Sequence, residues 1–170
     1  MSAIAPVLLL AIGNESRGDD ALGPLLLRRL GQWLEDQDST GEVELIEEYQ
    51  LQIEHTLDLK GRELVLFIDA GKDTPAPYAF YRAAIKRLDG YTTHAVAPET
   101  LLGVYAMVHD AAPPPAFILC VAGNVFELGE PLSAAAELNL QHACDFARRL
   151  LECTALDAWQ HYARDSVSLA

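Results

Sequence analysis

The chain has 170 residues, of which 51% are hydrophobic and 22% charged, and its formal net charge is −13. This length is typical of one domain, and the composition excludes an intrinsically disordered chain. The excess of acidic residues argues against nucleic acids and anionic membranes as partners, because phosphate groups are bound by clustered lysine and arginine. No apolar run approaches the ~20 residues of a transmembrane helix.

Apolar runs alternate with segments of helical periodicity along the chain. Continuous apolar runs predict strands buried on both faces at residues 7–12 and 64–68. Further strands are expected at 43–46 and 117–121, and prolines precede a short edge strand at 78–81. Helical spacing of apolar residues predicts helices at 22–33, 51–59, 98–108 and, with Ser133 as the N-cap, up to residue 151. Strands that alternate with helices predict the α/β class, as a three-layer α/β/α fold with a mostly parallel, twisted sheet of about five strands.

We expect a single domain over residues 1–170, with a core at 7–151 and a C-terminal tail at 152–170. Leu156 and Trp159 favour a further helix in the tail. The three cysteines form no CxxC pair, which is typical of reduced thiols and predicts a cytoplasmic location. Cys120 and Cys144 lie in apolar segments and are expected in the core, where free cysteine is often buried.

A glycine-bounded loop with the sequence GNESRGDD follows the first predicted strand, at residues 13–20. A phosphate-binding P-loop shares this strand–loop–helix layout but has lysine and serine or threonine after its last glycine. Asp19 and Asp20 occupy those positions here, and two carboxylates repel a nucleotide and attract a cation. We expect them at a helix N-terminus, where they satisfy free N–H groups. The loop therefore predicts a metal-ion site.

Two further polar residues are expected near this loop. Ligands of open α/β sheets bind beyond the carboxyl ends of the strands, and Asp69 follows the third strand directly. A carboxylate there requires a cation or hydrogen-bond donors. His94 lies in the loop before the helix at Pro98 and can return to the same edge. Two carboxylates and one imidazole suit zinc or nickel, with positions open for water or substrate; the pattern alone does not separate Asp19 from Asp20 as a ligand.

Four motifs, in this order, resemble the endopeptidases that mature the large subunit of [NiFe] hydrogenases. They are IGNxxxGDDxxG at residues 12–23, IDA at 68–70, TTH at 92–94 and FELGxxLS at 126–133. The similarity extends from about Val7 to Leu151. Two segments depart from the family's common pattern: residues 47–55 replace a glycine-rich segment, and residues 120–124 replace a Gly-Ile-x-Pro turn. These departures indicate a distinct subgroup.

The resemblance implies a three-layer α/β/α fold and a nickel-dependent endopeptidase. Such an enzyme removes the C-terminal extension from a hydrogenase large-subunit precursor after nickel insertion. Asp20, Asp69 and His94 fall on the family's metal-binding and catalytic positions. Asp19 would then cap the helix or form hydrogen bonds that support the ligand residues. The precursor carries the nickel, so the enzyme alone need not hold metal.

Two other functions remain open at this point. One is a non-catalytic chaperone that binds the nickel-loaded precursor, and the other is a metal-dependent hydrolase of a small molecule. The chain has no Ser/His/Asp nucleophile elbow and no reactive-cysteine context, so covalent catalysis is not expected. His55 is expected to be a surface or structural histidine.

Overall fold

The computed structural model describes residues 3–39, 41–88, 90 and 95–168. The strands are β1 (Val7–Ile12), β2 (Val43–Glu48), β3 (Leu64–Gly71), β4 (Tyr78–Arg82) and β5 (Ala116–Ala122). The helices are α1 (Leu22–Asp36), α2 (Thr56–Leu59), α3 (Pro98–His109), α4 (Ala134–Glu152) and α5 (Leu156–Ser168). Short 3₁₀ turns at Gly18–Ala21 and Ile53–His55 precede α1 and α2.

The five strands form one sheet in the order β2-β1-β3-β5-β4. β2, β1, β3 and β5 are parallel, and β4 pairs antiparallel with β5 at the edge. This arrangement confirms the prediction of a mostly parallel sheet with a short edge strand. Since the parallel strands all point the same way, the segments that follow β1, β3 and β5 meet at one edge of the sheet, where the candidate site lies.

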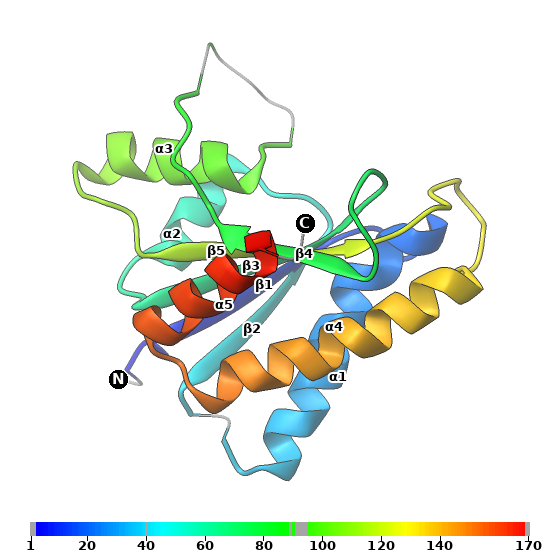
Figure 1. The fold of residues 1–170 in the computed structure, drawn as a ribbon. Coiled ribbons are helices and arrows are strands. Elements are labelled where there is room, and N and C mark those ends of the chain that lie inside the picture. The colour runs from blue at the N-terminus through cyan, green and yellow to red at the C-terminus, as the bar shows by residue number, and fades with distance from the viewer. Residues whose placement is uncertain (1–2, 40, 89, 91–94, 169–170) are drawn as a thin grey trace.

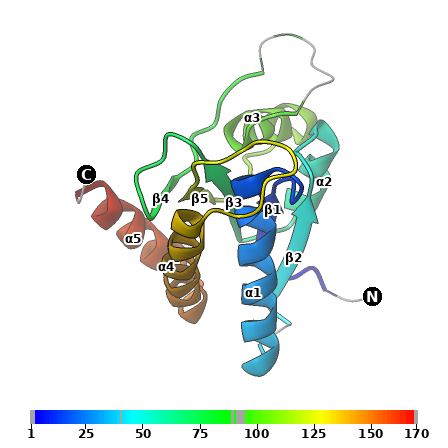
Figure 2. The same ribbon diagram turned by 90° about the vertical axis from the view of Figure 1, so that its right-hand side faces the viewer.

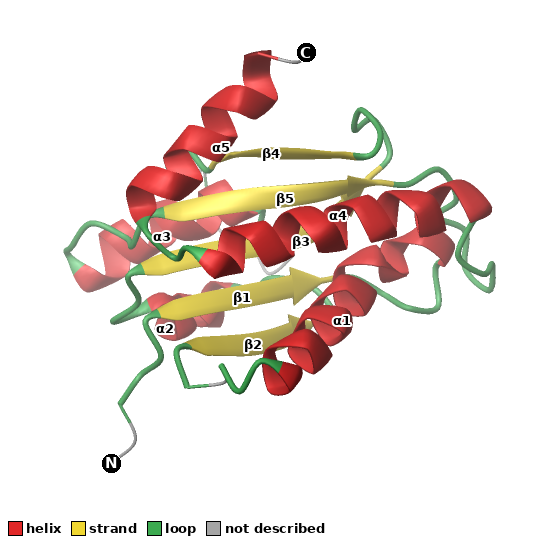
Figure 3. Ribbon diagram, turned by 60° about the horizontal axis from the view of Figure 1, so that its bottom comes forward, coloured by secondary structure: helices red, strands yellow, loops and turns green. Residues whose placement is uncertain are grey.

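Helices cover both faces of the sheet and give the predicted three layers. α1, α4 and α5 pack on one face, and α2 and α3 pack on the other (Figures 1 and 3). Alternate side chains of β1 face opposite layers: Leu9 joins the α1/α4/α5 core, whereas Leu8 and Leu10 join the α2/α3 core. Burial of β1 on both faces explains its continuous apolar sequence.

The C-terminal tail forms α5, as its sequence favours, and one side chain fixes it to α4. Trp159 is fully buried, and its indole Nε1 donates to the carbonyl oxygens of Leu150 at 3.0 Å and Cys153 at 3.1 Å. These carbonyls lie at the end of α4, where the ordinary helical partners are missing; Leu150 O also accepts from Cys153 N–H at 3.3 Å. Trp159 therefore combines burial of apolar area with capping of the preceding helix.

Several details differ from the sequence-based expectations. Leu34, and not Trp33, completes the buried stripe of α1, because the packed face includes Leu27 as well as the expected leucines. Leu57 and Val108 are exposed, at 69% and 60%, since the α2/α3 layer is thin and leaves one side of each helix in solvent. In the part of the chain that the structure describes, no helix has the length and apolar character needed to cross a membrane.

Candidate active site

Asp19 is a fully buried carboxylate that joins two loops. It accepts hydrogen bonds from the backbone N–H groups of Asn124 at 2.7 Å, Val125 at 3.0 Å and Ser133 at 2.8 Å, and from the Ser133 hydroxyl at 2.8 Å. Burial opposes ionisation of Asp19, but the four hydrogen bonds outweigh it, so the pKa of this carboxyl lies below its ordinary value. Asp19 is thus a structural anion that holds the loop between β5 and α4.

The two loops also meet through their backbones. Gly18 N–H donates to Glu130 O at 3.0 Å, and Gly129 N–H donates to Ser16 O at 2.7 Å. Gly18 has a φ of +54°, and a side chain there would collide with the carbonyl of Val125, so glycine is required on both grounds. Figure 2 shows the yellow loop before α4 lying against the blue turn after β1.

This geometry corrects one prediction about the GNESRGDD loop. The carboxylates of Asp19 and Asp20 do not cap α1, whose N-terminus has no side-chain cap. Asp19 instead binds at Ser133, which is the N-cap residue of α4 and accepts from Ala136 N–H at 3.2 Å. The helix that benefits from the carboxylate is therefore α4, over a hundred residues along the chain, and local spacing could not reveal it. The predicted role of Ser133 as an N-cap is confirmed.

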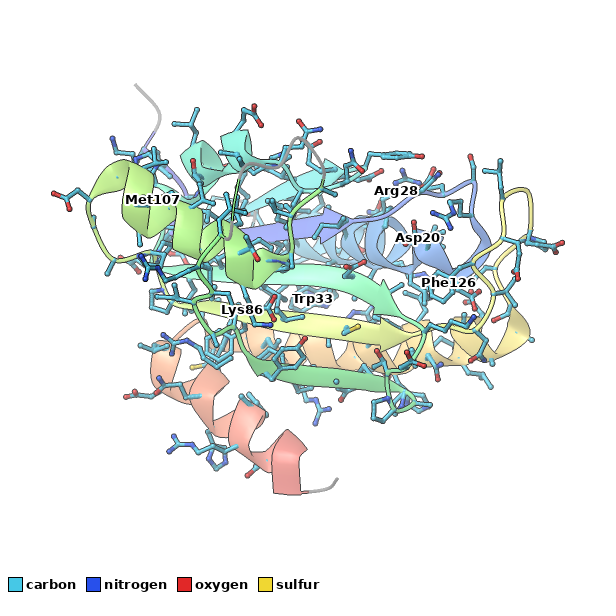
Figure 4. The ribbon with its side chains drawn as sticks, turned by 90° about the horizontal axis from the view of Figure 1, so that it is seen from above. Asp20, Arg28, Trp33, Lys86, Met107 and Phe126 are labelled. Atoms are coloured by element: carbon cyan, nitrogen blue, oxygen red, sulfur yellow. The ribbon has the colours of Figure 1, made fainter. Side chains whose placement is uncertain are left out.

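Asp20 follows directly, in the 3₁₀ turn, and is half-buried at the carboxyl edge of the sheet. Asn14 N–H donates to Asp20 Oδ2 at 2.9 Å, and Asp20 N–H donates to Arg17 O at 3.1 Å. These two bonds fold the loop back on itself and fix one carboxylate oxygen. Figure 4 shows Asp20 and Phe126 beyond the arrowheads of the strands, at the edge expected for a ligand site.

Asp69 lies within β3, paired in register with Cys120 of β5. Burial raises its pKa to about 7, a hydrogen bond from Ala70 N–H at 2.8 Å opposes this rise, and the negative charge of Asp20 adds to it. Asp20 and Asp69 are thus close enough to repel each other. Cys120 is only half-buried, unlike Cys144, so the expected core position holds fully for Cys144 alone. Burial raises the pKa of the Cys120 thiol, which accordingly favours its neutral form.

His94 and its neighbours Thr92 and Thr93 lie outside the described residues, so the third predicted ligand stays a prediction. Among the residues that are described, no group of three His, Cys, Asp or Glu side chains could hold a metal ion. The described part of the site therefore offers two carboxylates, Asp20 and Asp69. A nearby cation would relieve both their mutual repulsion and the cost of desolvating Asp69.

His55 occupies a local structural position. Its Nδ1 accepts from Gln52 N–H at 2.8 Å and so closes the turn before α2, while its Nε2 lies 3.5 Å from the carboxylate of Glu48. The structure thus places His55 in a capping arrangement, in agreement with a structural histidine.

A hollow of about 700 Å³ adjoins the loop that carries Asp20, and it was not predicted from the sequence. Its lining comes from four separate loops: Asn14, Arg17, Tyr49, Lys72, Phe126, Glu127 and Leu128. The loops after β1, β2, β3 and β5 are distant in the chain, and only the strand order brings them together. Arg17 Nε donates to Phe126 O at 3.2 Å across this hollow.

The fold is that of the [NiFe] hydrogenase maturation proteases. The maturation protease HycI from Thermococcus kodakarensis superposes with a TM-score of 0.65 at 19% identity, covering 88% of this chain and 94% of that chain. The maturating endopeptidase HybD from E. coli superposes with a TM-score of 0.61 at 20% identity, covering 86% and 92%. HybD from Thermococcus kodakarensis gives 0.57 at 20% identity, covering 85% and 97%. No family model and no curated protein matches the chain in sequence.

Proposed function

We propose that this protein is an endopeptidase that removes the C-terminal extension of a [NiFe] hydrogenase large-subunit precursor. The observation that carries the proposal is the pair Asp20 and Asp69 at the carboxyl edge of a sheet with the maturation-protease fold. Three of the four sequence motifs of that family, at residues 12–23, 68–70 and 126–133, coincide with this edge or with the loops that build it. Nickel inserted in the precursor is the recognition element, and Asp20, Asp69 and His94 are the residues that meet it.

The carboxylate pair supports recognition of a cation that the substrate brings. Asp69 is half-buried next to a second acidic residue, and both effects disfavour its charge. A divalent cation beside the two carboxylates offsets burial and repulsion together. A nickel-free precursor offers no such compensation and is expected to bind weakly. The protease thereby checks that metal insertion is complete before the irreversible cut.

Peptide cleavage itself requires a water molecule, a proton acceptor and a fixed substrate. Water attacks the carbonyl carbon of the scissile bond while a carboxylate accepts one proton of this water, and the same carboxyl group then gives that proton to the departing amine as the C–N bond breaks. Asp20 is held rigidly by Asn14, so the proton acceptor and the docked bond keep a constant geometry. Such positioning lowers the entropic cost of the attack.

The proposal is tested with the purified protein and a nickel-loaded large-subunit precursor. Mass spectrometry should detect a shortened large subunit and a released C-terminal peptide. The variant D20N should abolish release, whereas D73N, which alters an exposed acidic residue beyond β3, should retain it. A stable complex without release would favour the chaperone function. Hydrolysis of small esters with added metal, and no action on the precursor, would favour the small-molecule hydrolase.

A further inference from the structure

The hollow beside Asp20 carries two cations on an otherwise acidic protein. Arg17 and Lys72 line it, and both are exposed. The chain has only 12 lysine and arginine residues against 25 acidic ones, so two cations facing one hollow create a local field opposite to that of the whole molecule. Glu127 also lines the hollow, but in the described part of the chain no ion pair joins it to either cation.

Neither Arg17 nor Lys72 forms an ion pair within the described part of the protein. Arg17 donates through Nε to Phe126 O, which leaves the outer guanidinium N–H groups to point elsewhere. Other arginines near this edge are paired, as Arg28 is with Glu15 and Glu47. Among the described residues Lys72 has no acidic partner. Exposed arginine and lysine with free donors are the groups that bind a carboxylate, arginine in a forked geometry and lysine as a point charge.

Apolar groups lie next to the two cations. Leu128 is 75% exposed, and the ring of Tyr49 is 64% exposed. The Tyr49 hydroxyl is held by Asn14 Nδ2 at 2.6 Å, so this ring is fixed as one wall of the hollow. Phe126 is half-buried on the opposite loop. The hollow therefore combines a cationic pair with aromatic and aliphatic surface, which suits a peptide better than a simple inorganic anion.

The hollow is continuous with the candidate active site. Asn14 lines the hollow, and its backbone N–H donates to Asp20 Oδ2. Arg17 likewise lines it, and its carbonyl accepts from the backbone of Asp20. A chain that lies in the hollow therefore contacts the same two residues that hold Asp20 in place.

We propose that this hollow binds an extended segment of the substrate next to the cut bond, through an acidic side chain flanked by an apolar one. The carboxylate pairs with Arg17 and Lys72, and the apolar neighbour packs on Tyr49, Phe126 and Leu128. This inference rests on the proposed peptidase function. The hollow would add a preference for an acidic residue in the substrate. Asp20 and Asp69 cannot supply this preference, because their carboxylates favour cations.

The test uses ¹⁵N-labelled protein and two synthetic hexapeptides that differ at one position. One has glutamate between two leucines, and the other has lysine in that position. In NMR titrations the glutamate peptide should bind about fivefold more tightly, as expected for one or two exposed ion pairs. The amide signals that shift should include Asn14, Arg17 and Leu128.

Two charge-reversal variants separate the hollow from general electrostatics. K72E should remove the preference for the glutamate peptide. K60E changes the net charge equally, at an exposed lysine directly after α2, and should retain the preference. The folded spectrum of each variant is the check that the chain is intact. Equal binding of the two peptides, or a preference that survives K72E, would overturn the inference.

These outcomes are independent of the cleavage assay. A preference lost in K72E together with an uncleaved nickel-loaded precursor would uphold the hollow and reject the peptidase. Cleavage of the precursor by a protein that shows no peptide preference would reject the hollow alone.

Discussion

Asp19 and Ser133 are joined twice: the backbone N–H and the hydroxyl of Ser133 each donate to the Asp19 carboxylate at 2.8 Å. Because Ser133 also caps α4, this pair connects the turn after β1 to the last large helix of the fold. Asp20 is the next residue in the chain. The position of the candidate catalytic carboxylate therefore depends on a buried neighbour that does not itself face the substrate.

The variant D19A is expected to destabilise the protein by about 3–5 kcal/mol, because it leaves three buried N–H groups and a hydroxyl without their acceptor. Urea denaturation measures the free energy of unfolding. D73A, at an exposed position, should change it by less than about 0.5 kcal/mol. A loss of less than about 1 kcal/mol in D19A would show that Asp19 is not a major connection between the loops.

The stability of the protein is also expected to fall at acidic pH because of Asp19. Its folded-state pKa is lowered from an ordinary value of about 3.9, so the carboxylate contributes stability that is fully present above that value. This contribution is lost as the pH falls through the lowered pKa. D19N lacks the titration, and its free energy of unfolding should therefore fall less steeply below pH ~4 than that of the wild type. Parallel slopes for both proteins would contradict the assignment.

The contribution of Asp69 to the free energy of unfolding should have the opposite pH dependence. Its folded-state pKa is about 7, above the ordinary value of about 3.9, so the favourable contribution is present at low pH and is lost as the pH rises towards 7. D69N should equal the wild type near pH 4 and exceed it above pH 7, by on the order of 2 kcal/mol once solvent screening is allowed for.

The comparison for D69N is made by thermal melts of the metal-free protein between pH 4 and pH 8. D73N is the control, since this exposed carboxylate should give no gain at either end. A D69N protein that is less stable than the wild type at pH 8 would mean that Asp69 makes a favourable contact that outweighs its burial.

The sequence predicted the three layers well because strands buried on both faces carry an unbroken apolar pattern, as in β1. It placed Asp69 directly after the third strand, whereas β3 continues to Gly71 and includes Asp69; the five apolar residues mark the end of the fully buried segment and not the end of the strand. It could not predict the partners of Asp19, which lie at Asn124, Val125 and Ser133. Such contacts depend on the order of the strands, and residue spacing carries no information about it.

The hollow beside Asp20 was unpredictable for the same reason. Lys72 follows β3 and Tyr49 follows β2, and each alone resembles an ordinary surface residue. Only the parallel neighbours β2, β1 and β3 bring these loops to one edge. Residue spacing also did not identify every buried side chain of the helices. Val108 has the spacing of a core residue but lies outside the α2/α3 core.

The variants D20N and H94A are expected to abolish precursor cleavage while leaving the fold intact. D20N keeps an oxygen that can accept from Asn14 N–H but loses the negative charge that a cation requires. H94A removes the predicted imidazole ligand. Circular dichroism and thermal melts report the fold, and mass spectrometry of the precursor reports cleavage. Full cleavage by either variant would remove that residue from the proposed site.

Cleavage is expected to require nickel within the precursor, and not nickel in solution. Asp20, Asp69 and His94 would leave much of the coordination of a free ion to water, so the protein alone should bind Ni²⁺ loosely. An ion that the precursor already holds adds its contacts to those of the peptide in one encounter. Nickel-loaded precursor should therefore be cut, and nickel-free precursor should remain intact even with excess nickel salt during a short incubation. Rapid cutting of metal-free precursor in the presence of a chelator would instead make the carboxylates an ordinary acid–base pair that acts without metal.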